Sequence, residues 1–169
     1  MTELWKDIPE YEGAYQASSL GRIRSLARYV NCAYGAKRKI KSTVLKPGRY
    51  CKSGHVSVVL GNGTNGRPVH QLVMLVFKGA RPKGLDIRHL DGDPLNNRAD
   101  NLIYGTRTEN ILDVYNNGGK WRKLTKSQVK EIRRLLAEGV KINTIADVYK
   151  VSYHTIHNIK QGRTYKWLP

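Results

Sequence analysis

The sequence predicts an α+β protein of 169 residues built from three small modules in an elongated arrangement. Three observations support this class. Short apolar runs broken by glycine predict strands in the first half, helical periodicity dominates the last third, and 40% hydrophobic residues with one Phe indicate modest cores. We place the modules at residues 1–45, 46–118 and 119–169.

The first module, residues 1–45, is predicted to be β-rich. Aromatic and polar residues alternate around Gly13 and Gly21, which predicts strands over residues 15–17 and 22–26. The segment 34–42, YGAKRKIKS, is predicted to be a loop in which cations crowd together. The alternative is a solvated loop, but phosphate contact suits the charge of the chain better. The basic residues of this module that we expect to contact phosphates of a polyanionic partner are Arg22, Arg24, Lys37, Arg38, Lys39 and Lys41.

The middle module, residues 46–118, opens with a predicted hairpin and a helix. The run HVSVVL predicts a strand over residues 55–60, and GNGTNG predicts a turn before residues 67–69. The apolar run over residues 70–77 predicts a short buried helix.

A strand–strand–helix unit is predicted to follow. One strand ends at His89, a second covers residues 102–104, and a helix starts near Thr108. This order would bring His89 and Asn110 together, with Asn101 at the turn between the strands.

The third module, residues 119–169, is predicted to hold three helices. Thr125 and Gln128 form a capping box for a helix over 126–138, which Gly139 ends. Helices over 142–149 and 153–160 flank a tight link, as in a helix-turn-helix; the alternative is a plain three-helix cap. The outward-facing residues, expected to contact DNA, are Ser152, Tyr153, His154, Thr155, Asn158 and Lys160.

The charge of the chain points to a polyanionic partner. The net charge is +17: residues 1–69 carry 12 Lys+Arg against 4 Asp+Glu, residues 70–118 carry 6 against 6, and residues 119–169 carry 12 against 3. Two basic ends and a neutral centre suggest a chain that grips double-stranded DNA at both ends and acts on it in the middle. An RNA-binding role ranks lower, because no aromatic-rich recognition motif is present.

Other classes of function are disfavoured. Cys32 and Cys51 form no C-x-x-C pair, so we expect free thiols in a reducing compartment and neither a disulfide framework nor a zinc knuckle. The sequence shows no signal peptide and no 18-residue apolar run, so we expect an intracellular protein without a membrane role. We expect no small-molecule substrate and a monomer on DNA.

The stretch at residues 87–110, IRHLDGDPLNNRADNLIYGTRTEN, carries the most specific signal. Considered in short parts, the stretch reads as a turn-rich loop. The spacing of its acids does not match that of a calcium-binding EF-hand loop. Taken whole, it resembles the HNH nucleases, in particular the phage-type homing endonucleases. The positions that carry this resemblance are His89, Asp91, Gly92, Asn96, Asn97, Asn101, Leu102, Thr106, Glu109 and Asn110.

The resemblance implies a ββα-metal site with Mg²⁺ or Mn²⁺, in the cytoplasm of the host cell if a phage encodes the chain. His89 aligns with the general base, Asn101 with the residue that pins the loop, and Asn110 with a metal ligand. The flanks are similar to the N-terminal DNA-binding module and the helix-turn-helix often attached to these nucleases.

One position departs from the pattern. Arg88 stands where the best-known phage member has an acidic metal ligand, and an Arg cannot bind a cation. Either Asp113, Asp86 or His70 completes the metal site, or Arg88 neutralises the scissile phosphate, or the site is weakened. We therefore predict a site-specific DNA endonuclease that leaves 5′-phosphate and 3′-hydroxyl ends; the alternative is a non-catalytic DNA-binding regulator with a decayed HNH site.

Overall fold

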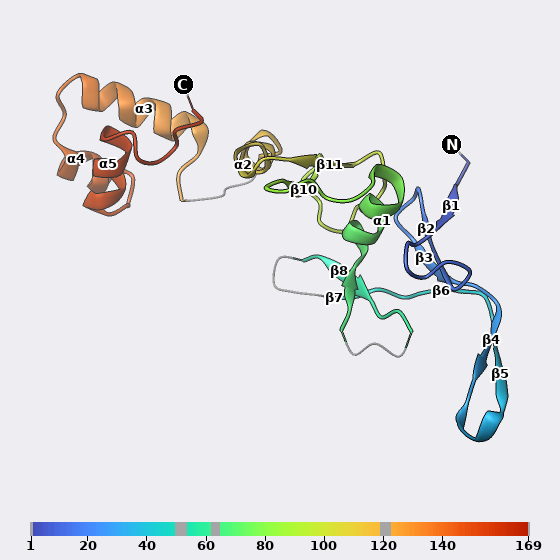
Figure 1. The fold of residues 1–169 in the computed structure, drawn as a ribbon. Helices are drawn as coiled ribbons and strands as arrows, with labels where there is room; N and C mark the ends of the chain where they lie inside the picture. Colours follow the sequence, from blue (N-terminus) through green and yellow to red (C-terminus); the bar gives the residue numbers. More distant parts are fainter. Residues whose placement is uncertain (1, 50–53, 62–64, 119–122, 169) are drawn as a thin grey trace. The chain divides into compact units, whose positions relative to one another are not determined.

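The computed structural model describes residues 2–49, 54–61, 65–118 and 123–168 (Figure 1). The chain divides into two compact units, Met1–Asp113 and Val114–Pro169. Each unit mixes a small core with short elements, and the combination of strands and helices confirms the predicted α+β class. No helix in the described part of the chain is long and apolar enough to cross a membrane.

The N-terminal sheet is an antiparallel arrangement of four short strands. In spatial order these are β1 (Trp5–Asp7), β2 (Tyr15–Ser18), β3 (Ile23–Ser25) and β6 (Thr43–Val44). Ala17 pairs with Ile23 between β2 and β3, and both side chains are buried. The strands predicted at residues 15–17 and 22–26 are confirmed.

A hairpin replaces the loop predicted over residues 34–42. Strand β4 (Arg28–Asn31) pairs antiparallel with β5 (Lys37–Ile40), and a short 3₁₀ turn, Ala33–Gly35, connects them. The prediction of a loop was wrong, because backbone hydrogen bonds hold a two-stranded ribbon without any apolar face. A strand with charged side chains on both faces carries no hydrophobic alternation to mark it.

The predicted hairpin and buried helix that precede the site are present. Strands β7 (Gly48–Arg49), β8 (Val56–Val58) and β9 (Arg67–Pro68) form an antiparallel sheet. Much of the predicted turn, residues 62–64, lies outside the described residues. Helix α1 (Val69–Lys78) follows at once and buries Val69, His70, Leu72, Val73 and Met74.

The predicted strand–strand–helix unit is confirmed. Strand β10 (Asp86–His89) pairs antiparallel with β11 (Leu102–Gly105), so that His89 lies opposite Leu102. Helix α2 (Arg107–Asn116) begins two residues after β11.

One hydrophobic core joins the N-terminal sheet to this unit. Ile8 and Ile23 pack in the same cluster as Leu72 of α1 and Leu102 of β11. Residues from both modules predicted for the first 118 positions thus contribute to a shared core, which positions the elements that carry His70 and His89.

The second unit is a three-helix assembly. It contains α3 (Lys126–Ala137), α4 (Ile142–Val148) and α5 (Tyr153–Lys160), and the predicted capping box of Thr125 and Gln128 is formed. The apolar side chains buried in the helices are Val129, Ile132, Ile145, Ala146, Ile156 and Ile159. The short connection between α4 and α5 is the one expected for a helix-turn-helix.

Candidate active site

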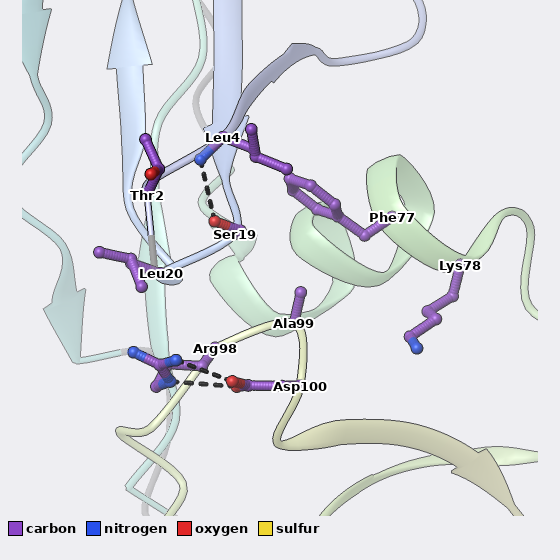
Figure 2. A pocket seen from close by; sticks show the side chains of 9 residues that line it. All are labelled: Thr2, Leu4, Ser19, Leu20, Phe77, Lys78, Arg98, Ala99 and Asp100. Atoms are coloured by element: carbon purple, nitrogen blue, oxygen red, sulfur yellow. Dashed lines mark hydrogen bonds and ion pairs between the residues drawn. The ribbon is translucent and has the colours of Figure 1, made fainter.

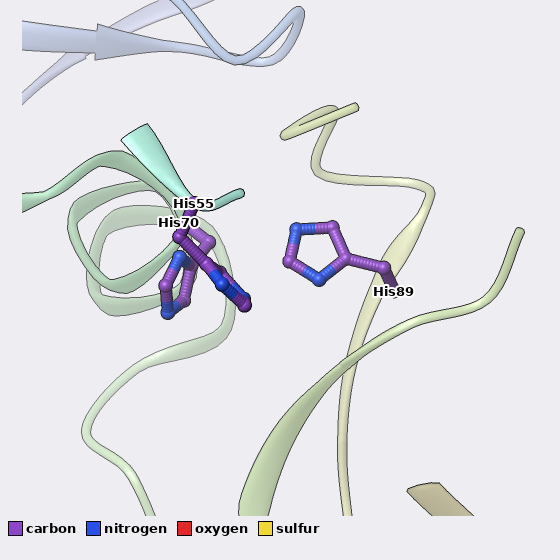
Figure 3. A group of neighbouring side chains, drawn as sticks. All are labelled: His55, His70 and His89. Atoms are coloured by element: carbon purple, nitrogen blue, oxygen red, sulfur yellow. The ribbon is translucent and has the colours of Figure 1, made fainter. Parts of the chain in front are cut away.

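Three histidines meet from three different elements (Figure 3). His55 lies directly before β8, His70 lies in the first turn of α1, and His89 ends β10. Their ring centroids are 4.6 Å apart for His55 and His70, 5.3 Å for His55 and His89, and 5.6 Å for His70 and His89. The sequence singled out His70 and His89 but missed His55, whose only signal was its place at the start of a predicted strand.

The environment of these histidines favours neutral imidazoles. Burial lowers the pKa of His70 to about 3, with further lowering by the charges of His55 and His89. Burial, then the charge of His89, lowers the pKa of His55. Burial also lowers the pKa of His89, although its bond to Asn97 and the charges of Asp91 and Asp93 oppose the shift. Neutral rings keep a nitrogen lone pair free for a proton or a cation.

We expect the free energy of unfolding to decrease as the pH falls from 7 to 5. A histidine whose folded pKa lies below 6.5 binds a proton in the unfolded chain before the folded one, so acid favours unfolding between the two pKa values. His70 alone contributes a slope of up to about 1.4 kcal/mol per pH unit within that window. Urea unfolding at several pH values measures the free energy of unfolding, and His70→Gln should make that free energy less dependent on pH. A wild-type curve that is flat from pH 7 to 5 would contradict the buried neutral ring.

Asn97 sets the tautomer of His89. The amide nitrogen of Asn97 donates to the Leu95 carbonyl at 3.0 Å, so its Oδ1 faces Nε2 of His89 at 3.3 Å. Because an amide oxygen only accepts, Nε2 carries the hydrogen and Nδ1 keeps the lone pair. Asn97 is buried, and it was not among the residues predicted to act on the imidazole.

The N-terminal sheet supports the loop that carries Asn97. Gly21 has φ +82°, and a Cβ there would lie 2.6 Å from the carbonyl carbon of Asn97. Nearby, the backbone N–H of Ala99 donates to the Ser19 carbonyl at 3.0 Å. Only a glycine permits this close approach, so the turn at Gly21 is part of what holds Asn97 against His89.

Asn101 holds the same loop closed. Its Nδ2 donates to the Asp91 carboxylate at 2.9 Å and to the Asn96 carbonyl at 2.8 Å, while its Oδ1 accepts from the Asp91 N–H at 3.2 Å. Desolvation raises the pKa of Asp91, but the hydrogen bonds that its carboxylate accepts from Asn96 and Asn101 outweigh this effect, so the pKa is lowered. Asn101 therefore contacts the loop, and Asn97 contacts the imidazole.

Arg88 forms ion pairs with two acids of α2. Its Nε and Nη2 donate to the two carboxylate oxygens of Asp113 at 2.7 and 2.9 Å, and its Nη1 lies 3.2 Å from Glu109. The side chains of Arg88 and Asp113 are 12% and 14% exposed. A Cβ on Gly105 would lie 2.4 Å from Arg88 Cδ, so this glycine leaves the space that the Arg crosses.

The other residues predicted to bind a metal have separate surroundings. Asn110 lies in α2, half-buried, and its backbone N–H donates to the Thr106 carbonyl at 3.1 Å. Asp86 pairs with Arg107 at 3.5 Å. Both oxygens of Asp113 accept from Arg88, so that carboxylate is engaged in this structure.

The described residues contain one group of three His, Cys, Asp or Glu side chains that could hold a metal ion. It consists of the three histidines, with one ligand atom of each lying within 4.8 Å of the others. This set offers nitrogen rather than the oxygen that Mg²⁺ prefers, so it fits Mg²⁺ poorly.

A cavity of about 560 Å³ lies elsewhere on the first unit (Figure 2). The segment before β1, the end of α1 and the loop before β11 line it, and the Arg98–Asp100 ion pair marks one side. None of the three histidines lines this cavity.

The predicted DNA contacts of the N-terminal sheet fall into two groups. Arg22 pairs with Glu3, and Arg24 stacks on Trp5 at 4.2 Å while it donates to Gln16. Lys37, Arg38 and Lys39 lie exposed along β5, and Lys41 is exposed just beyond it. The β5 cations are thus the more accessible group.

The predicted contacts of the second unit lie at the start of α5 and along it. Ser152 caps the helix, and Tyr153, His154 and Lys160 are exposed. Thr155 and Asn158 are half-buried rather than fully outward as expected, because both line a small depression beside Leu124 and Tyr165.

Two family models match the chain. Residues 3–61 match the NUMOD4 motif, and residues 67–112 match the HNH endonuclease model. The second match covers α1, β10, β11 and most of α2, which carry His70, His89, Asn97, Asn101 and Asn110.

Two known proteins are similar to the chain in sequence. The chain is 32% identical over 116 residues to DNA endonuclease I-HmuI of Bacillus phage SP01, an alignment that covers 68% of this chain and 59% of the relative. It is 27% identical over 158 residues to an uncharacterized HNH endonuclease, L247, of Acanthamoeba polyphaga mimivirus, covering 91% of this chain and 35% of the relative. The chain thus spans less than two thirds of each relative's length.

A solved structure has the same fold. It is titled as DNA binding and cleavage by the HNH homing endonuclease I-HmuI, and it matches 94% of this chain and 90% of its own with a TM-score of 0.51 and 23% identity. The two family matches, the relatives and this fold agree with the ββα geometry around His89. Residues 67–112 thus carry an HNH endonuclease domain, and residues 3–61, which precede it, carry a NUMOD4 motif.

Proposed function

We propose that this protein is a site-specific, metal-dependent endonuclease that hydrolyses phosphodiester bonds of double-stranded DNA. One observation carries the proposal: a buried, neutral His89 whose Nδ1 lone pair is fixed by the bond between Nε2 and Asn97. A general base needs this combination of a defined tautomer and a pKa below the working pH. The family match and the relatives named as endonucleases support it.

His89 would accept the proton of the attacking water. As the water oxygen bonds to phosphorus, the bond to the 3′ oxygen breaks, and the leaving oxygen takes a proton from solvent, so the products are a 5′-phosphate and a 3′-hydroxyl. When bound, Mg²⁺ or Mn²⁺ supplies charge stabilisation for the phosphate and the leaving oxygen. Asn110 is our proposed oxygen ligand for that ion, because the histidines offer nitrogen and Arg88 occupies Asp113.

Asn101 and Arg88 would support this chemistry without touching the water. Asn101 keeps the loop between β10 and β11 closed through Asp91 and Asn96. Arg88 holds α2 against β10 through Asp113, and this position of α2 in turn places Asn110.

The basic segments at both ends would bind the DNA. The exposed cations of β5 suit phosphate contact, and α5 follows a tight link as a recognition helix does. We propose that one copy of the chain binds one DNA site.

The test is cleavage of supercoiled plasmid DNA that carries mapped sites, in Mg²⁺ and separately in Mn²⁺. We expect nicked or linear product, absent when the ion is chelated. The alternative, a DNA-binding regulator with an inactive site, is favoured by the engagement of Asp113 with Arg88. Tight, site-specific binding with no product in either ion would establish that alternative.

Replacing Lys37, Arg38 and Lys39 with glutamine should reduce the salt dependence of DNA binding. Each phosphate contact contributes about 0.9 to the slope of log affinity against log salt, so loss of three contacts should lower the slope by about 2.7. Binding titrations between low and moderate salt measure it. The matched control replaces the exposed Lys78, Arg81 and Lys83, which removes the same charge outside the hairpin. Equal slopes for the two triple variants would show that β5 does not contact phosphates.

A further inference from the structure

We propose that His55, His70 and His89 form a binding site for Zn²⁺, and that Zn²⁺ bound there blocks the base of the cleavage reaction. The binding part stands on the geometry of the three rings alone. The inhibitory part rests on the proposed function, because it needs His89 to be the base.

The first argument is the arrangement of donor atoms. One ligand atom from each of the three rings lies within 4.8 Å of the other two, and the rings converge from the strand β8 side, from α1 and from β10 (Figure 3). Zn²⁺ binds imidazole nitrogen at about 2.0–2.1 Å, so its ligand nitrogens lie about 3.3 Å apart in a tetrahedron. The side chains would rotate to close the remaining gap, and three protein ligands leave one position of a tetrahedral Zn²⁺ for water.

The second argument is an unsatisfied nitrogen. Among the described residues, Nδ1 of His70 is buried and finds no hydrogen-bond partner, and the whole residue is 9% exposed. A buried polar atom without a partner lowers the stability of the fold, and such atoms in native proteins commonly mark an ion or a water. A metal ion bound to Nδ1 of His70 would give this atom a partner. Imidazole suits Zn²⁺ and other late transition metals better than Mg²⁺.

The third argument is the hydrogen-bond partner at the other ring nitrogen of His89. A histidine that binds a metal usually donates its other ring N–H to an oxygen, which fixes the ring and strengthens the ligand. Asn97 Oδ1 occupies that place at Nε2. The nitrogen left for the ion is Nδ1, the same atom that would accept the proton from water. One lone pair cannot serve both, so Zn²⁺ and base catalysis exclude each other.

The binding test uses Co²⁺, which replaces Zn²⁺ in nitrogen sites and absorbs visible light. The full chain, without a histidine tag or DNA, is titrated with CoCl₂. We expect one equivalent to produce the intense visible bands of four-coordinate Co²⁺, without the charge-transfer band that a cysteine ligand would cause, and we expect ZnCl₂ to abolish the bands.

Matched variants locate the ion. His55→Gln and His70→Gln should lose the bands or weaken binding by at least about ten-fold, as removal of one ligand should. His154→Gln removes an exposed histidine of α5 and should keep them. Circular dichroism checks each fold, and His55→Gln carries the test if the more buried His70 variant unfolds. Absence of the bands in the wild type, or bands unchanged in folded His55→Gln, would overturn the site.

The inhibition test follows cleavage in Mg²⁺ as ZnCl₂ is added up to one equivalent of protein. We expect a loss of at least about ten-fold that a Zn²⁺ chelator reverses, since the base contributes that much or more. Zn²⁺ that binds by the Co²⁺ assay but leaves the rate unchanged would refute the inhibitory role. A chain that never cleaves DNA would refute the proposed function, while the absorption bands would still decide the Zn²⁺ site.

Discussion

Replacing His89 with alanine is expected to lower DNA cleavage by about 10²–10⁴-fold, the usual contribution of a general base. DNA affinity should be unchanged, because the exposed cations lie on β5 and in the second unit rather than at His89. The measurement is single-turnover cleavage of a mapped site with saturating protein, beside a binding titration. Saturation separates loss of chemistry from loss of binding.

Two further variants sharpen the His89 result. Asn97→Ala leaves the imidazole but removes the oxygen at Nε2, so we expect a smaller loss, about 10–100-fold, as for other groups that orient a reactive histidine. His157→Ala removes a histidine of α5 that is not a member of the three-histidine cluster, and it should keep full chemistry at saturation. A His89→Ala protein that cleaves at the wild-type rate would remove His89 from the mechanism.

Replacing Arg88 with methionine should destabilise the strand–strand–helix unit by about 3 kcal/mol, the lower end of the cost of leaving one partner of a buried ion pair alone. The low exposure of Arg88 and Asp113 places this pair nearer the buried than the surface case. Hydrogen exchange at the amides of β10 and β11 in the full chain measures the local free energy of opening. Arg107→Met is the matched control: its pair with Asp86 is exposed, so we expect a change of at most about 1 kcal/mol.

The double variant Arg88→Met with Asp113→Leu distinguishes the two roles of Arg88. If Arg88 acts by holding α2, an apolar pair should recover much of the lost stability and of the cleavage rate. If Arg88 neutralises the scissile phosphate, stability should recover while cleavage stays about one to two orders of magnitude low, because a charge-assisted contact is still missing. The contacts with Asp113 and Glu109 favour the first outcome.

Local signals made much of the fold predictable. The helix over residues 153–160 was predicted with the bounds that α5 has, and the capping box of Thr125 and Gln128 formed as expected. Caps, apolar spacing and turn glycines act within a few residues, so the sequence displays them directly. The strand–strand–helix unit followed for the same reason, since the motif at residues 87–110 spans it without interruption.

Features without an apolar pattern were not predictable in this way. Strand β5 carries Lys37, Arg38 and Lys39 in its ladder with β4, and its charge suggested a loop. Backbone hydrogen bonds between the two strands decide that structure, and they are indifferent to side-chain polarity.

By itself, the sequence determined that the chain contains a ββα unit around His89 and that this unit lies between two basic segments. Only the tertiary structure decided what surrounds that imidazole. It brought His55 and His70 to it from separate elements, set Asn97 against Nε2 with help from the turn at Gly21, and paired Arg88 with Asp113, 25 residues away. Such contacts depend on how distant segments pack around a shared core, and no spacing within one segment encodes them.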